Sequence, residues 1–129
     1  MSTPIVFISH FRIKGGDADT IRDLFRRTTA RLETEKPRTA LFLAYLDDGA
    51  TRVSFVHGFA DAGSMDVHFE GAGERAKAAY EYLEPEGWEL YGSPSDVALE
   101  TLRQSAASAG VHLHVHPEYV AGFLRLAHQ

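Results

Sequence analysis

The apolar residues of this chain recur with two periods, one typical of strands and one typical of helices. Four segments combine β-branched and aromatic residues in short runs and are expected to form strands: 4–14, 40–46, 52–59 and 88–92. The longer segments between them place apolar residues three and four positions apart, which predicts helices within 17–36 and 65–84. The chain therefore alternates strand, helix, strand, strand, helix, strand.

Short polar motifs mark the ends of these elements. Asp17 or Asp19 is expected to cap the first helix and Ser64 the second, which residues 71–73, with two glycines, are expected to interrupt. The Asp-Gly pair within 47–51 predicts a hairpin between the second and third strands. This β-α-β-β-α-β order is typical of an α+β, ferredoxin-like fold, an antiparallel sheet with both helices on one face.

Both faces of the expected sheet are apolar. In the first strand Ile5, Phe7 and Phe11 lie on one side, whereas Val6 and Ile8 lie on the other. Helices cover only one of these faces, so the second face needs another cover. A second copy of the same sheet would supply it, which predicts a homodimer in which two sheets pack as an α/β barrel.

An extension, residues 93–129, follows the 1–92 core, and the two together are expected to form a single domain. Ser93, Pro94 and Asp96 match the first positions of a third helix, which Gly110 would end. The next residues read as a strand that joins the edge of a sheet. We favour the partner's sheet for this strand.

The composition of the chain limits the classes of function that it can have. The chain has 129 residues, no cysteine and a formal charge of −5, with acidic and basic residues interspersed. Such a surface lacks the basic patch that binds nucleic acid, and any metal would have to be held by histidine and carboxylate. No apolar run is long enough to span a bilayer and no signal peptide opens the chain, so we expect no membrane partner and a cytoplasmic location.

The segment 111–116, VHLHVH, raises the question of a metal site. In a strand its three histidines, His112, His114 and His116, would lie on one face in a single row. Neighbours in that row are about 7 Å apart, so the outer pair cannot easily share one ion, and no third ligand has a recognisable spacing. We therefore expect no metal here and retain a His-ligated metalloprotein as one alternative.

Three passages of the chain, HGFADAGSMDVHF (57–69), LYGSPSD (90–96) and AGFLRL (121–126), resemble the antibiotic biosynthesis monooxygenase family. The resemblance implies a small dimeric α/β-barrel protein. That family includes cofactor-independent oxygenases of polyketide quinones, quinol monooxygenases and haem-degrading enzymes. The haem-degrading members use an asparagine near their iron, but this chain contains no asparagine, which disfavours haem degradation.

The resemblance thus implies a cofactor-independent monooxygenase that acts on a small aromatic, quinol or polyketide-like compound. Two alternatives remain, a non-catalytic dimeric barrel that binds a small apolar or aromatic ligand and the metalloprotein above. Cofactor-free oxygenation needs a base, a donor for the resulting anion and a dry aromatic pocket. A histidine suits the role of base because its pKa lies near neutrality.

His68, in the second helix, is the candidate base, and His10 of the first strand is the candidate that shares its pocket. The even-numbered positions of that strand are expected to face the helices, which would also bring Arg12 to the site as the ligand of an oxyanion or carboxylate. The other candidates for substrate binding share an aromatic ring that could line the pocket: Tyr45, His57, Phe59, Trp88 and Tyr91.

Overall fold

The computed structural model of the protein describes residues 3–15 and 17–125. Within them the chain forms, in order, β1 (Ile5–Ile13), α1 (Ala18–Glu35), β2 (Thr39–Leu46), β3 (Arg52–Phe59), α2 (Ala62–Phe69), α3 (Ala72–Ala79), β4 (Leu83–Tyr91), α4 (Asp96–Ala109) and β5 (Leu113–His116). The predicted β-α-β-β-α-β core is confirmed, with its second helix divided into α2 and α3. A further helix and strand follow, as the sequence predicts.

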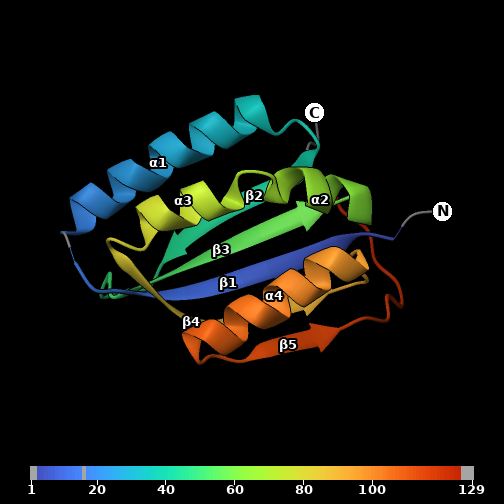
Figure 1. Ribbon diagram of the computed structural model, residues 1–129. Coiled ribbons are helices and arrows are strands. Elements are labelled where there is room, and N and C mark those ends of the chain that lie inside the picture. Colours follow the sequence, from blue (N-terminus) through green and yellow to red (C-terminus); the bar gives the residue numbers. More distant parts are fainter. Residues whose placement is uncertain (1–2, 16, 126–129) are drawn as a thin grey trace.

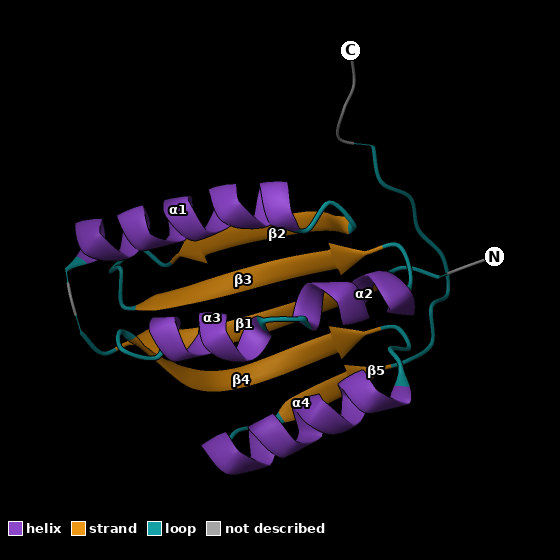
Figure 2. Cartoon of the chain, turned by 45° about the horizontal axis from the view of Figure 1, so that its top comes forward, coloured by secondary structure: helices purple, strands orange, loops and turns teal. Residues whose placement is uncertain are grey.

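The five strands form one sheet in the order β2-β3-β1-β4-β5. Each neighbouring pair among β2, β3, β1 and β4 is antiparallel, but β5 runs parallel to β4, so the sheet is mixed. All four helices among the described residues lie on one face of the sheet, which is the ferredoxin-like arrangement (Figures 1 and 2). The expectation that β5 joins a partner's sheet is wrong here, because β5 completes the edge of its own sheet next to β4.

Caps decide where the helices begin. Asp17 caps α1, where its carboxylate accepts a hydrogen bond from the Thr20 amide at 2.7 Å. The cap of α2 is Asp61 rather than Ser64, which instead donates its own amide to the Asp61 carboxylate at 2.7 Å. A carboxylate at this position also interacts favourably with the helix dipole.

The third predicted helix begins later than expected, whereas the second begins earlier. Ser95, not Ser93, caps α4 and accepts a hydrogen bond from the Ala98 amide at 3.1 Å. Gly110 ends that helix in a left-handed conformation, as predicted, with φ at 70°.

A glycine and a proline shape the second half of the core. Gly71 has φ at 80° and separates α2 from α3, because a left-handed residue cannot continue an α-helix. Strand β4 begins at Leu83, five residues before the predicted start, and contains Pro85. Since β5 pairs with β4 only from Trp88 onward, Pro85 lies in the half of β4 that has a free side, where a strand tolerates proline.

The helix face of the sheet carries the core, and the odd-numbered residues of β1 point into it. Ile5, Phe7 and Phe11 are buried there with residues from β3 and β4 and from every helix except α3. The sequence-based expectation that even-numbered positions face the helices is therefore wrong. Both sides of β1 carry apolar residues, so the alternation of residues alone could not show which side the helices cover. A shift of one residue exchanges the two sides.

Within residues 3–15 and 17–125, no helix covers the opposite face of the sheet, which carries Val6, Ile8, Leu41, Leu43, Tyr45 and Val56. Leu43 and Tyr45 there are 39% and 60% exposed. We propose that a second copy of this chain covers this open face, because an uncovered apolar sheet face is costly in water.

Replacing Leu43 by glutamate tests the dimer. We expect the wild-type protein to have twice the mass of one chain by light scattering, and Leu43→Glu to shift it to the monomer, because the new carboxylates would be buried without partners. Val97→Glu is the matched control, since Val97 is 78% exposed on α4, on the helix side of the molecule. A monomeric wild type would contradict the proposal, as would equal dissociation in both variants.

None of the helices within the described residues combines the length and the hydropathy that crossing a bilayer requires.

Candidate functional site

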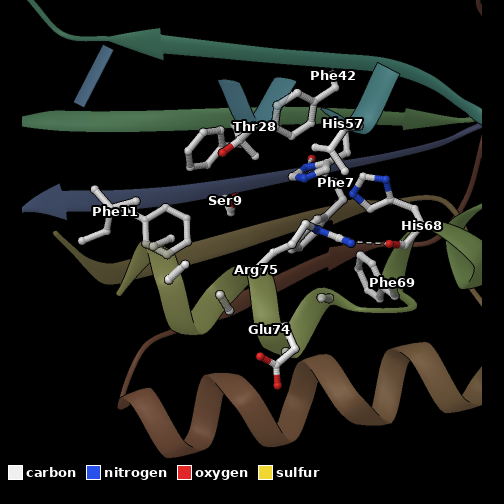
Figure 3. Close-up of a pocket in the computed structure, with 18 of the residues that line it drawn as sticks. Phe7, Ser9, Phe11, Thr28, Phe42, His57, His68, Phe69, Glu74 and Arg75 are labelled. Carbon is white, nitrogen blue, oxygen red and sulfur yellow. Dashed lines mark hydrogen bonds between the residues drawn. The ribbon is translucent and has the colours of Figure 1, made fainter. Parts of the chain in front are cut away.

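A pocket of about 520 Å³ lies between the helix face of the sheet and helices α1, α3 and α4. Its volume is within the range of small-molecule sites, about 300–1,000 Å³. Eight aromatic side chains from the sheet and from α1, α2 and the end of α3 line it: Phe7, Phe11, Phe25, Phe42, Phe55, Phe69, Tyr80 and Trp88. Figure 3 shows two histidines together near Phe7 and Phe42, well separated from Phe11.

His57 lies on β3 and points toward the pocket (Figure 3). Its Nδ1 is 3.0 Å from the backbone oxygen of Phe7, and a carbonyl can only accept, so Nδ1 carries the hydrogen. The other ring nitrogen, Nε2, is then an unprotonated acceptor. Burial lowers the pKa of His57 to about 4 against the opposing effect of this hydrogen bond, and nearby Arg75 lowers it further, so the ring is neutral at pH 7.

His68 is in the last turn of α2, beside His57. Its Nδ1 is 2.7 Å from the Thr39 hydroxyl on β2, and its ring centroid is 5.2 Å from that of His57 with the planes nearly perpendicular. Burial lowers the pKa of His68 to about 3, and the charge of His57 when that ring is protonated, together with those of Arg75 and Lys36, lowers it further. The two rings are therefore a neutral pair that can take up one proton far more easily than two.

Arg75 is the charged group next to this pair, and it was not among the residues predicted from the sequence. It extends from α3 and donates Nη2 to the His68 backbone oxygen at 2.5 Å (Figure 3). Its Nη1 donates to the Glu70 backbone oxygen at 3.1 Å. Burial lowers the pKa of Arg75. The signal available in the sequence was a single arginine within AGERAKAA, a segment of mostly small residues that leaves room for a pocket.

Three of the predicted site residues line this pocket: His57, His68 and Trp88. Phe59, which was expected to form part of the wall, lies behind it. Phe59 is 2% exposed and its ring centroid is 5.2 Å from that of His68, so it supports the histidine rather than facing the cavity. Phe42 and Phe69 line the pocket instead of Phe59.

His10 and Arg12 do not reach the pocket, because they lie on the open face of the sheet. His10 Nδ1 is 2.8 Å from the Ser54 hydroxyl, and its Nε2 is 3.2 Å from the Glu89 carboxylate. Arg12 forms an ion pair with Glu84. The prediction that these two share a site with His68 is wrong, because the even-numbered side chains of β1 point to the open face and not toward the helices.

Tyr45 and Tyr91 are also on the open face, away from the pocket. Tyr45 is 60% exposed, whereas Tyr91 stacks on His116 of β5 at 4.8 Å between ring centroids with the planes 8° apart. Neither ring lines the cavity that contains the histidine pair.

The histidine row of the extension is likewise on the open face. Val111, Leu113 and Val115 pack against the core, while His112, His114 and His116 are exposed on the other side. The structure thus confirms the alternation predicted for this strand, although β5 itself starts only at Leu113. Among residues 3–15 and 17–125, no three histidine, aspartate or glutamate side chains are placed to hold one metal ion.

No family model matches the chain, and no curated protein sequence is significantly similar to it. Solved structures do share its fold. MupZ from Pseudomonas fluorescens superposes with a TM-score of 0.68 at 13% identity and covers 96% of both chains, which includes most of the extension. SnoaB from Streptomyces nogalater, a cofactor-independent oxygenase, superposes with a TM-score of 0.59 at 15% identity over 73% of this chain and 96% of its own.

A protein from Deinococcus radiodurans, proposed to be an antibiotic biosynthesis monooxygenase, superposes with a TM-score of 0.56 at 14% identity, over 70% of this chain and 93% of its own. These likenesses show that the chain has the fold of antibiotic biosynthesis monooxygenase-like proteins. At these sequence identities the similarities show only the fold, and the chemistry has to be argued from the pocket.

Proposed function

We propose that this protein is a cofactor-independent monooxygenase of a small aromatic compound such as a quinol or a polyketide-like phenol. The observation that carries the proposal is the neutral His57–His68 pair inside an aromatic pocket, with the Nε2 lone pair of His57 available to accept a proton. The description of SnoaB, which has the same fold, as a cofactor-independent oxygenase supports it.

The proposed reaction begins with a proton transfer to His57. The lowered pKa of this histidine keeps it unprotonated at pH 7 but also makes it a weaker base than a free histidine, so the substrate proton has to be acidic. The substrate is an electron-rich ring system with an acidic CH2 group or the phenol tautomer of one, and loss of its proton to Nε2 gives in both cases the same enolate. This anion transfers one electron to O2, and the resulting substrate radical and superoxide combine to form a C–O bond. The proton on His57 then passes to the peroxide that has formed.

Loss of water completes the reaction. The carbon loses its second hydrogen as a proton while the O–O bond breaks, which gives a carbonyl and releases hydroxide that is protonated to water. The balance is CH2 + O2 → C=O + H2O, in which carbon loses four electrons and O2 gains four. His68 is neutral and is held by its hydrogen bond with Thr39, so it can orient or stabilise the anionic oxygen as it forms.

The aromatic walls are suited to this chemistry. Phe7, Phe42 and Phe69 surround the histidines and exclude water from them. A dry site strengthens hydrogen bonds to the anion and protects the substrate radical from side reactions. A planar substrate would pack against these rings.

Oxygen uptake with anthrone tests the proposal, because the carbonyl of anthrone acidifies its CH2 group. We expect the protein to accelerate O2 consumption above the spontaneous rate, to form one quinone per O2, and to incorporate one atom of ¹⁸O2 into the new carbonyl. Treatment with EDTA should leave the rate unchanged. Saturable binding of anthrone and quinols without O2 uptake would contradict the proposal in favour of the ligand-binding alternative.

A further inference from the structure

The end of the pocket that contains the histidines is also lined by positive charge. Arg75 lines the cavity, and its guanidinium lies beside both imidazoles in Figure 3. Lys36 lies close enough to lower the pKa of His68. Because the histidines themselves are neutral, Arg75 is the cation that a molecule bound beside them would contact.

Arg75 has no carboxylate within ion-pair distance among the described residues. The two acidic side chains that also line the cavity are engaged or directed elsewhere. Glu35 lies close enough to Arg75 to oppose the lowering of its pKa, but its carboxylate pairs with Arg31 on α1 at 3.7 Å. Figure 3 shows the Glu74 carboxylate directed away from the histidines, toward α4. A partly buried guanidinium in an apolar cavity is costly unless an anion accompanies it.

The guanidinium also has hydrogen-bond donors to spare. Arginine carries five N–H groups, and Arg75 donates to two backbone oxygens, those of His68 and Glu70. The donors that remain can bind the two oxygens of a carboxylate in the forked geometry that arginine favours. Those two backbone bonds also hold the guanidinium in place before a ligand arrives.

We propose that the substrate of this pocket is an aromatic carboxylate, bound through its carboxylate to Arg75 with its rings against the phenylalanine walls. The inference rests on the proposed function only in taking this pocket as the substrate site. The Arg75 anchor would set the orientation of the rings relative to His57, and neutral aromatic compounds of the same shape would be weaker ligands.

The competing explanation is that Arg75 is purely structural. Its backbone partners lie at the C-terminal end of α2, where cations stabilise exposed carbonyls. Lys36 has that structural role as well, since its Nζ donates to the Val67 oxygen at 2.9 Å, but Lys36 does not line the cavity. It therefore provides a matched control.

Binding of 2-naphthoate and 2-naphthamide at pH 7.5 and low salt, measured by calorimetry, tests the proposal. The two ligands have nearly the same shape, but only the first is charged. We expect the wild-type protein to bind naphthoate about tenfold more tightly, the effect of one charge-assisted hydrogen-bonded contact. Arg75→Gln, which keeps donors for the backbone oxygens, should lose that preference and bind naphthamide as before.

Lys36→Gln should keep the preference for naphthoate. Equal affinity of the wild type for both ligands would overturn the proposal, as would absence of binding or loss of the preference in Lys36→Gln to the same extent as in Arg75→Gln. Binding is measured without oxygen turnover, so this result is independent of the anthrone experiment. A preference for naphthoate with no O2 uptake from any substrate would refute the oxygenase and leave the anion site intact.

Discussion

Replacing His57 by glutamine will lower the rate of anthrone oxidation by at least about 100-fold, the usual contribution of a positioned general base. Glutamine is similar in size and can still donate to the Phe7 backbone oxygen, but it has no nitrogen lone pair that takes up a proton. The fall is expected in kcat, measured by initial O2 consumption, with little change in the affinity for an unreactive aromatic ligand.

His10→Gln is the matched control for this variant. It makes the same exchange on the open face, where His10 contacts Ser54 and Glu89, and it should retain the wild-type rate. A similar loss of activity in both variants would contradict the assignment of His57 as the base, because the effect would not be specific to the pocket.

Replacing His57 by glutamine also changes how the free energy of unfolding depends on pH. The pKa of His57 is about 4 in the folded protein and near 6.5 when unfolded, so between these values the unfolded chain binds a proton that the folded one does not. The free energy of unfolding of the wild type should therefore fall as the pH decreases from 6.5 to 4. His57→Gln removes this contribution, and urea titrations at both ends of the range should show a shallower decline.

Replacing Phe59 by alanine will have the largest effect on stability. Phe59 is 2% exposed at the end of β3, and its ring packs against those of His57 and His68 at 6.3 and 5.2 Å between centroids. Loss of a fully buried phenylalanine costs about 3–5 kcal/mol, because apolar contacts disappear and a cavity remains. Urea unfolding followed by circular dichroism measures this change in the free energy of unfolding.

Val97→Ala provides the comparison, since Val97 is 78% exposed and should change stability by less than about 0.5 kcal/mol. A cost below about 1 kcal/mol for Phe59→Ala would show that this end of β3 is not part of the core. In that case Phe59 could again be considered a wall of the pocket, as the sequence analysis expected.

Local sequence signals determined most of the fold. The β-α-β-β-α-β order follows from residue periodicity, which reports the backbone conformation of each segment directly. The cap at Asp17, the break at Gly71 and the end of α4 at Gly110 depend on a side chain or a φ angle within a few residues. Such features need no information about the rest of the chain.

Helix starts were less certain where two capping residues compete. Asp61 precedes Ser64 and Ser95 follows Ser93 in the sequence, and each pair offers two acceptable N-caps. The hydrogen bonds in the structure choose Asp61 and Ser95. The alternatives differ by two or three residues and leave the course of the chain unchanged.

The site itself was only partly predictable. His57, His68 and Trp88 were identified by residue type, whereas His10, Arg12, Tyr45 and Tyr91 were expected at the pocket and lie on the opposite face. A strand with two apolar faces has no pattern that shows which face the helices cover, and a choice that is wrong by one residue reverses every side chain.

The sequence by itself therefore determined the elements, their order and the expectation of a ferredoxin-like sheet, because these depend on interactions between near neighbours in the chain. Only the tertiary structure decided which face holds the pocket, that β5 pairs with its own β4, and that Arg75 lies beside the histidine pair. These features depend on contacts between residues far apart in the sequence, and on which side of the sheet the helices pack against. Alternation could not show that side, because both faces carry apolar residues.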